Sequence, residues 1–442
     1  MDREATVVGA GIVGVSTALH LQRRGFAVTL VDRRPPGRET SFGNAGVINA
    51  GSAVALNNPD LHRSLARLLR NRDAGLRYDP RHVLRRLPWC LAFLEHSKTS
   101  AARRTAHALH GLVSRAPAEH RALMDLAGNR HRFREVGWLK VFRDGGPGRA
   151  ARELEGFAGR TLRELGTSLR TLDAAALAEL EPSLAPIFGS AIHLVDGGFV
   201  DDPGALVAEY AERFRADGGT IVEAEVRRIA EGGDGASWTA ANGTRRTGTV
   251  VVAAGPWSGE LLASCDREAP LNVERGYHAH FRLAGGASLW HSVHDVDAGY
   301  VMGPMAAGLR VTTGVELAAR DAPSNLAQLE AVAPRVAEAV PIEGRTPDPV
   351  WRGARPTLPD SLPAIGRLPG ATRLWANFGH QHVGLMTGPV SGRLCAELIA
   401  GEGPVVDPAP FAPGRCIVRR RAADGGRWRG RRLGGGTPPA TG

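Results

Sequence analysis

The sequence predicts an α/β (α+β) fold with two domains, one a Rossmann-like dinucleotide-binding domain and the other built on an antiparallel sheet. The chain opens with a strand–glycine–helix–strand pattern, and a second βαβ-like pattern follows over residues 189–229. Alternating apolar residues then run over 274–317, as expected for an antiparallel sheet with turns. With 442 residues the chain is also too long for one small core.

The opening pattern is ATVVGAGIVGVSTALHLQRRGFAVTLVDRR, near the N-terminus. Its glycines have G-x-G-x-x-G spacing, which permits a tight turn, close approach of the backbone to a pyrophosphate, and close packing of the next helix. That helix is expected from about Ile12 to Arg24, with its N-terminus offered to an anion. Asp32 ends the following strand, where a carboxylate can hold ribose hydroxyls. The glycines in question are Gly9, Gly11 and Gly14.

The rest of the chain alternates between helical and strand patterns. A small, Gly-rich loop follows at 40–58, and residues 61–128 carry apolar residues at helical spacing. Later we expect a buried strand at 248–253 that enters an Ala-Gly turn, a helix within 323–340, a Pro/Gly loop at 350–370, and a strand followed by a closing helix from 373 to 401.

Charge and composition exclude some classes of protein. The net charge is +10, but residues 415–442 hold eight arginines and one aspartate, a net of +7, which leaves +3 for the body. We therefore expect a disordered Arg/Gly-rich tail over 416–442 and no nucleic acid as a partner of the body. Four separated cysteines fit no disulfide or metal pattern, and no apolar run is long enough for a membrane span. The first strand leaves no room for a signal peptide, so the expected location is the cytoplasm.

Glycine-rich turns recur far along the chain, at VVVAAG (250–255) and NFGHQHVGLMTGP (377–389). A large cofactor held by separated segments explains this distribution, and FAD fits it better than NAD. The chain resembles the FAD-dependent amino-acid oxidoreductases of the glycine oxidase and D-amino-acid oxidase type, and within them the bacterial D-amino-acid dehydrogenase branch. The resemblance covers about residues 5–415. It rests on the opening pattern and on TSFGNAG, GGFVDDPGAL, VVVAAGPWS, ERGYH, RGARPTLPDSLPAIG and FGHQHVGLMTGP.

This resemblance implies a discontinuous FAD-binding domain, formed by 1–55, 140–265 and 350–415. It leaves 56–139 and 266–349 for a substrate domain with a helical insertion. The implied cofactor is non-covalent FAD, because no cysteine lies near the segments that would meet the flavin. Residues implied to bind it are Gly9, Gly11, Ile12, Val13, Gly14, Asp32, Arg33, Ser41, Asn44, Ala45, Gly46, Val226, Gly255, Trp257, Gly379, His380, Val383 and Gly384.

The same resemblance implies three residues around the substrate. Arg355 matches an arginine that grips a carboxylate, and Tyr300 matches a tyrosine that closes on the substrate. His382 stands where glycine oxidase relatives have an arginine. From the residues alone, Arg355 suits a carboxylate because a guanidinium is a planar fork, and its proline-rich loop would hold it still. Tyr300 could equally be a core tyrosine. His380 and His382 have no third ligand at hand, so we expect no metal.

The implied reaction is oxidative deamination of an amino acid, with a D-amino acid as the favoured substrate, by hydride transfer to flavin N5 and with release of a 2-oxo acid and ammonia. One alternative is a secondary-amine enzyme acting on D-hydroxyproline, proline or sarcosine. Another class is a nucleic-acid or membrane interaction protein that uses the basic tail. The electron acceptor is expected to be a quinone or oxygen. Peripheral contact with the inner face of the membrane stays open, and the sequence does not give the oligomeric state.

Overall fold

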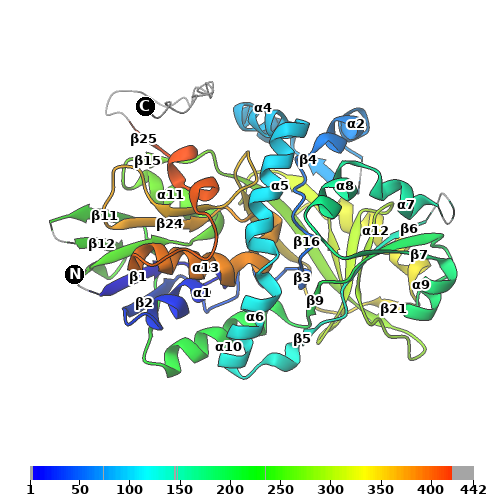
Figure 1. Ribbon diagram of the computed structural model, residues 1–442, viewed down its shortest axis with the longest axis horizontal. Helices are drawn as coiled ribbons and strands as arrows, with labels where there is room; N and C mark the ends of the chain where they lie inside the picture. Colours follow the sequence, from blue (N-terminus) through cyan, green and yellow to red (C-terminus); the bar gives the residue numbers. More distant parts are fainter. Residues whose placement is uncertain (1–2, 73, 144–145, 147, 234, 421–442) are drawn as a thin grey trace, which may run out of the picture.

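A computed structural model describes residues 3–72, 74–143, 146, 148–233 and 235–420 (Figure 1). The first of its two large sheets has six strands in the order β10-β2-β1-β14-β24-β23. All neighbours are parallel except β23 and β24. We call it the nucleotide sheet. Its strands are β1 (Glu4–Val8), β2 (Ala27–Asp32), β10 (Thr220–Glu223), β14 (Thr249–Val252), β23 (Ala364–Arg367) and β24 (Leu374–Phe378).

Five helices form one core with the nucleotide sheet. Apolar residues of α1 (Ile12–Gln22), α10 (Pro203–Ala216) and α13 (Gly384–Ala400) share a buried cluster with β1 and β2. The cluster also takes in α5 (Thr99–Val113) and α6 (Ala116–Ala127), whose His120 contacts the carbonyls of Leu385 and Met386. A three-stranded ribbon packs on the sheet through Trp238. It consists of β11 (Arg228–Gly232), β12 (Gly235–Ala240) and β13 (Gly243–Thr247).

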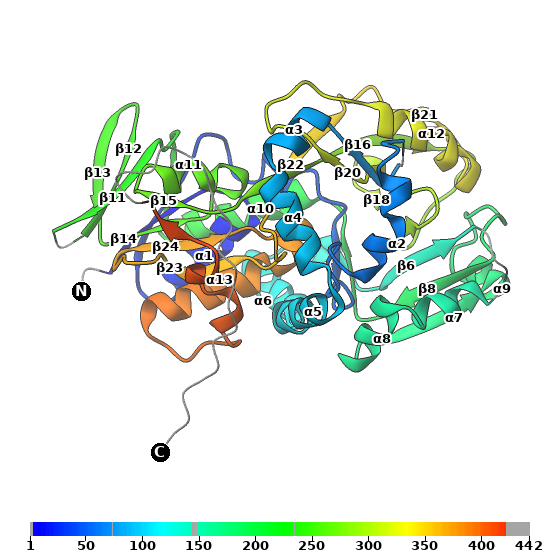
Figure 2. The same cartoon turned by 90° about the horizontal axis from the view of Figure 1, so that it is seen from above.

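The second sheet, which we call the substrate sheet, has eleven strands and lies beside the first (Figures 1 and 2). Its path is β4-β20-β16-β19-β18-β17-β6-β8-β7, with β21 and β22 also paired to β16. The strands are β4 (Leu76–Tyr78), β6 (Trp138–Phe142), β7 (Leu169–Asp173), β8 (Ser190–Leu194), β16 (Asn272–Leu283), β17 (Ser292–Asp295), β18 (Tyr300–Met305), β19 (Gly308–Thr313), β20 (Val315–Leu317), β21 (Ile342–Arg345) and β22 (Trp351–Thr357).

The remaining elements are short apart from one helix. Helix α12 (Ala327–Ala339) shares an apolar cluster with β17, β18 and β19. A small sheet consists of β3 (Val47–Asn49), β9 (Gly197–Val200) and β5 (Phe133–Arg134). Further helices are α2 (Pro59–Leu68), α3 (Pro80–Arg85), α4 (Leu87–His96), α7 (Arg149–Leu154), α8 (Phe157–Glu164), α9 (Ala174–Leu180) and α11 (Ser258–Ala263). None of the described helices is long and apolar enough to cross a membrane.

The fold class is confirmed, and so is the opening βαβ unit, in which β1 and β2 pair in parallel. The second expected unit, over 189–229, is wrong as a βαβ unit, because β8, β9 and β10 lie in three different sheets. The strand pairing also differs from the expected domain boundaries. Strands β7 and β8, within the expected 140–265 segment, pair in the substrate sheet. So do β6, which crosses the expected boundary at 139/140, and β22 from the 350–415 segment. Helices α5 and α6, expected in the substrate domain, pack on the nucleotide side. The alternation of apolar residues identifies a strand, but its partner depends on contacts far along the chain.

The expected start of the tail, at residue 416, is wrong for its first five residues. Ile417 is buried in the core beside the nucleotide sheet. Strand β25 (Val418–Arg419) pairs with β15 (Arg267–Glu268), and the amide of Arg420 donates to the carbonyl of Asp266 at 2.8 Å. Two exposed residues in a short edge pairing give no apolar pattern, so the sequence could not reveal them. The rest of the tail, 421–442, lies outside the described residues.

Candidate active site

A cavity of about 840 Å³ is lined by residues of both large sheets. Every residue expected to bind cofactor or substrate lines it, except Gly14 and Gly46. Residues that the chain separates by hundreds of positions are therefore brought to one site.

The three glycines of the opening turn are required for different steric reasons. Gly9 has a φ of +114°, and a Cβ on it would overlap the carbonyl of Ala253. A Cβ on Gly14 would overlap the carbonyl of Gly9, which explains why Gly14 shapes the site without lining it. A Cβ on Gly11 would meet only the Ser41 hydroxyl, at 3.2 Å. Gly11 thus leaves open the space that a pyrophosphate needs in front of α1.

Asp32 stands at the end of β2 and holds the glycine turn with one of its oxygens. Its Oδ2 accepts from the amide of Ala10 at 2.6 Å, and its Oδ1 accepts from the amide of Arg34 at 3.1 Å. Burial raises the pKa of Asp32, against the effect of these two amides. Each oxygen keeps a further lone pair, so the carboxylate can still accept from ribose hydroxyls.

An aromatic ring and a cation lie where the nucleotide channel is expected. The Arg33 guanidinium lies 3.9 Å from the centroid of the Trp257 ring and pairs with Glu39 at 2.6 Å. Trp257 ends the short helix η2 (Gly255–Trp257), which begins at Gly255 with a φ of +51°. Val226, just beyond β10, also lines the cavity, as Arg33 and Trp257 do.

The loop before β3 makes hydrogen bonds to α1 and to the substrate sheet. Ser41 Oγ accepts from the amide of Ile12 at 3.0 Å, and the Thr40 hydroxyl donates to the carbonyl of Ala354 at 2.8 Å. Arg310 of β19 donates from one nitrogen to the carbonyls of Phe42 and Asn44, at 3.0 and 2.8 Å. Sequence reasoning did not find Arg310, because nothing distinguishes it from the other arginines of this chain.

Turn geometry gives Gly46 its place in that loop. The amide of Gly46 donates to Asn44 Oδ1 at 2.9 Å, the φ of Gly46 is +79°, and a Cβ there would overlap the carbonyl of Val200. Gly46 therefore sets the path of the chain from Ala45 into β3, while Asn44 and Ala45 border the cavity.

The start of α13 forms another wall. Gly379, with a φ of +88°, turns the chain after β24, and Val383 and Gly384 begin the helix. The two histidines of this turn differ. His380 Nε2 is 3.0 Å from Ser391 Oγ inside α13, and burial lowers the pKa of His380 to about 3. His382 instead contacts the carboxylate of Glu274, with 2.5 Å between Nε2 and Oε2.

Arg355, Glu274 and His382 form a charged group at the substrate side. Glu274 of β16 lies opposite Arg355 of β22 in the sheet register. The Arg355 guanidinium rests over Gly276, where a Cβ would come within 2.5 Å of it. Burial lowers the pKa of Arg355, and the charge of Glu274 opposes that shift. The sequence pointed to Glu274 only as a letter of the ERGYH motif, because its pairing with Arg355 joins distant strands.

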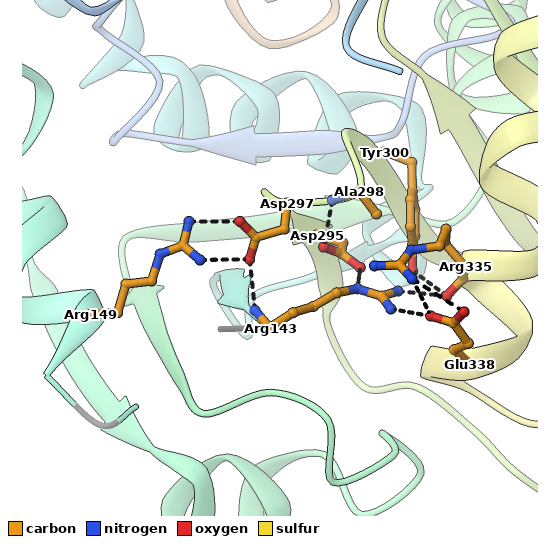
Figure 3. A network of polar contacts seen from close by, with 8 residues as sticks. All are labelled: Arg143, Arg149, Asp295, Asp297, Ala298, Tyr300, Arg335 and Glu338. Atoms are coloured by element: carbon orange, nitrogen blue, oxygen red, sulfur yellow. Dashed lines mark hydrogen bonds and ion pairs between the residues drawn. The ribbon is translucent and has the colours of Figure 1, made fainter. Parts of the chain in front are cut away.

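Tyr300 borders the cavity, but its hydroxyl is engaged elsewhere. The hydroxyl donates to the carbonyl of Arg335 on α12 at 3.4 Å, beside the Arg143–Asp295 ion pair (Figure 3). Burial raises the pKa of Tyr300. This arrangement favours the alternative reading of Tyr300 as a core tyrosine over that of a side chain that closes on the substrate.

These features are those of a dinucleotide-binding protein. The open face at Gly11, the acid at the end of β2 and the two helix N-termini that border one long cavity suit an extended dinucleotide, with charged side chains left for a second molecule. No group of three or more side chains that could hold a metal ion occurs among the described residues.

Comparison with known proteins agrees. The DAO family, described as FAD dependent oxidoreductase, matches residues 4–398, and the chain belongs to this family. It is therefore an FAD-dependent oxidoreductase. It is 31% identical to a D-amino-acid oxidase of Bradyrhizobium diazoefficiens (94% of this chain, 99% of the relative). It is 33% identical to D-amino acid dehydrogenase 2 of Pseudomonas aeruginosa (93% and 99%). Glycine oxidase from Geobacillus kaustophilus has the same fold, with a TM-score of 0.71 at 22% identity over 92% of this chain and 97% of that one.

Proposed function

We propose that this enzyme oxidatively deaminates D-amino acids to 2-oxo acids and ammonia. The observation that carries the proposal is Arg355, a guanidinium set into the cavity wall over Gly276. Its fork matches a carboxylate, and the low dielectric around it strengthens that pairing. The names of the relatives support the choice of D-amino acids.

The chain's own residues bind and orient the substrate. Arg355 takes the α-carboxylate and thereby fixes where the Cα hydrogen points. Glu274 positions His382 through a short contact, and its charge favours the protonated form of Arg355. Arg355 also donates to the carbonyls of Arg275 and Gly314, both at 3.4 Å. When bound, FAD supplies the acceptor for the hydride and its two electrons. The amine must be neutral when the hydride leaves, and the resulting imine then hydrolyses in water.

The experiment is anaerobic bleaching of the flavin absorbance with D- and L-amino acids, sarcosine and hydroxyprolines. D-selective bleaching by primary amines supports the proposal. Bleaching by L-amino acids alone would overturn the assigned chirality, and bleaching by hydroxyproline, proline or sarcosine alone would replace the primary amine with a secondary one.

FAD is held without a covalent bond in this proposal. None of the four cysteines, all of them described and free, lines the cavity. Acid precipitation should therefore leave the flavin in the supernatant, and flavin that stays with the pellet would contradict this expectation.

The electron acceptor is proposed to be a membrane quinone, reached from the cytoplasm at the inner face of the membrane. The support is a surface that we call the leucine face, with exposures from 44% to 71% at Leu56, Leu69, Leu84, Leu87 and Leu91. Leu84 lies on α3, Leu87 and Leu91 lie on α4, and Leu56 and Leu69 lie just before and just after α2. Figure 2 shows α3 and α4 next to each other. Leu56 also lines the cavity, so this face adjoins the active site. Exposed arginines on the same segment, such as Arg81 and Arg85, suit anionic lipid.

Two measurements test the acceptor. The FAD-loaded enzyme should sediment with vesicles that contain anionic lipid, and turnover should be faster with a soluble quinone analogue than with oxygen. Replacing Leu84 and Leu91 with Ser should reduce sedimentation, since both are exposed. Fast turnover with oxygen and no vesicle binding would make the enzyme an oxidase.

A further inference from the structure

Lys140 lines the same cavity far along the substrate sheet from Arg355. It lies on β6 opposite His294 of β17, and Trp138 lies two residues earlier on the same face of β6. The Lys140 ammonium is 5.0 Å from the centroid of the Trp138 ring, and that ring stacks on His294 with 6.0 Å between centroids. We call these three residues the distal cluster.

No hydrogen bond or ion pair joins Lys140 to any residue that the structure describes. The acids near the end of β17 are already held by arginines, as Figure 3 shows. Arg143 pairs with Asp295 at 2.7 Å, and Arg149 pairs with Asp297 at 2.6 Å. Burial lowers the pKa of Lys140, and only the more distant charge of Glu153 opposes this. An enclosed ammonium without a carboxylate is unfavourable, and an anionic ligand would offset that cost.

Other polar atoms of the distal cluster also lack partners. Trp138 Nε1 and His294 Nδ1 are buried with no hydrogen bond to the described part of the chain. Burial and the charge of Lys140 lower the pKa of His294 to about 3, so its ring is neutral at physiological pH. A neutral imidazole and an indole can each donate one hydrogen bond to a bound anion.

Lysine is rare in this chain. The chain has 55 basic residues, of which only Lys98 and Lys140 are lysines. Lys98 is exposed and pairs with Glu95 at 2.6 Å. In a chain that otherwise uses arginine for positive charge, the lysine inside the cavity supplies a compact ammonium on a flexible stem, which suits a single anionic oxygen better than a fork does.

We propose that the distal cluster is a second anion-binding subsite of the enzyme, which takes a carboxylate group. The proposal rests on the proposed function for the other end of the cavity. Five strand pairings separate β6 from β22, about 24 Å along the sheet at about 4.8 Å each, so Lys140 and Arg355 belong to different parts of the substrate sheet. The carboxylate has two possible sources: the far end of an extended amino-acid substrate, or a separate small carboxylate such as the 2-oxo acid product.

The test begins with binding, which does not depend on catalysis. In FAD-loaded Arg355→Ala enzyme, glutarate should raise the thermal midpoint, because the distal cluster remains. Lys140→Met in this background should weaken glutarate binding at least tenfold, whereas Lys140→Arg should recover part of it. Lys98→Met is the matched control and should bind glutarate as its parent does. Equal binding by the Lys140→Met and parent proteins would overturn the proposal, whether or not the enzyme deaminates amino acids.

Kinetics then separate the two sources. If the substrate itself reaches Lys140, the single Lys140→Met variant should lower kcat/KM for a D-amino acid with a remote carboxylate at least tenfold more than for D-alanine. If a separate anion binds, the ratio of these two kcat/KM values should stay unchanged, and pyruvate should alter turnover of the wild type but not of the variant. Failure of both arms, with glutarate binding also unaffected by Lys140→Met, would leave no anion subsite at Lys140.

Discussion

The two walls of the cavity present different parts of the chain to a ligand. On the nucleotide side the wall is formed mainly by backbone atoms. Gly9 and Gly14 allow main chain to pack against main chain, and Gly11 leaves the surface open. On the substrate sheet charged side chains line the cavity, with Arg355 and Lys140 on strands that are distant in sequence. A backbone surface tolerates almost no added atom, whereas a side-chain site can be changed residue by residue.

The strongest test of this contrast is a pair of identical substitutions in the opening turn. Gly14→Ala should displace α1, since its Cβ overlaps the Gly9 carbonyl. We expect loss of bound FAD and destabilisation of about 1–3 kcal/mol by overpacking. Gly11→Ala should keep the apoprotein's thermal midpoint and lower only the FAD affinity, because Gly11 has an ordinary φ of −73°.

FAD content by absorbance and the thermal midpoint of both apoproteins provide the readout. If Gly14→Ala remained yellow and as stable as wild type, the close contact between α1 and the glycine turn would not hold in solution.

The next largest effect is expected at Arg355. Arg355→Ala leaves the substrate carboxylate desolvated and unpaired, a cost of about 2–5 kcal/mol. The value of kcat/KM should fall roughly 30- to 5,000-fold, with much of the loss in KM. FAD content should not change. Arg355→Lys should recover only part, because an ammonium lacks the two-pronged geometry.

Steady-state kinetics with an artificial electron acceptor on flavin-loaded enzyme measure this effect. An Arg355→Ala enzyme within threefold of wild type on its best amino acid would remove Arg355 from the active site.

The same contrast explains what the sequence could predict. The opening turn and Asp32 form a short local motif, so spacing located them, and glycine content marked the start of α13. The resemblance to a known family added the roles of the α13 residues and of Arg355. Glu274 and Arg310 act through strand pairing and through contacts to a distant loop, which have no local pattern. Tyr300 fits its motif, yet its hydroxyl lies against α12, because neither motif nor alternation fixes where a side chain's polar end points.

Glu274 gives a smaller and more specific prediction. Glu274→Gln keeps the shape but removes the charge that faces Arg355 and His382. A hydrogen bond to a charged group is worth about 1.5–3 kcal/mol, so losing the charge of Glu274 should lower kcat/KM at least roughly tenfold. Because Glu274 acts by positioning His382, the effect should shrink in a His382→Asn background. Additive losses in the double variant would show that Glu274 does not act through His382.

The smallest effect is expected at Tyr300. Its hydroxyl contacts the Arg335 carbonyl at 3.4 Å, and its ring shares the apolar cluster under α12. Tyr300→Phe should therefore keep kcat/KM within threefold of wild type and lower the free energy of unfolding by only about 0.5–1.5 kcal/mol, the usual worth of one hydrogen bond. Kinetics on the best amino acid and urea unfolding measure the two quantities. A hundredfold loss of kcat/KM with unchanged stability would mean that Tyr300 turns into the cavity when substrate binds, and the substrate wall would then include a moving side chain.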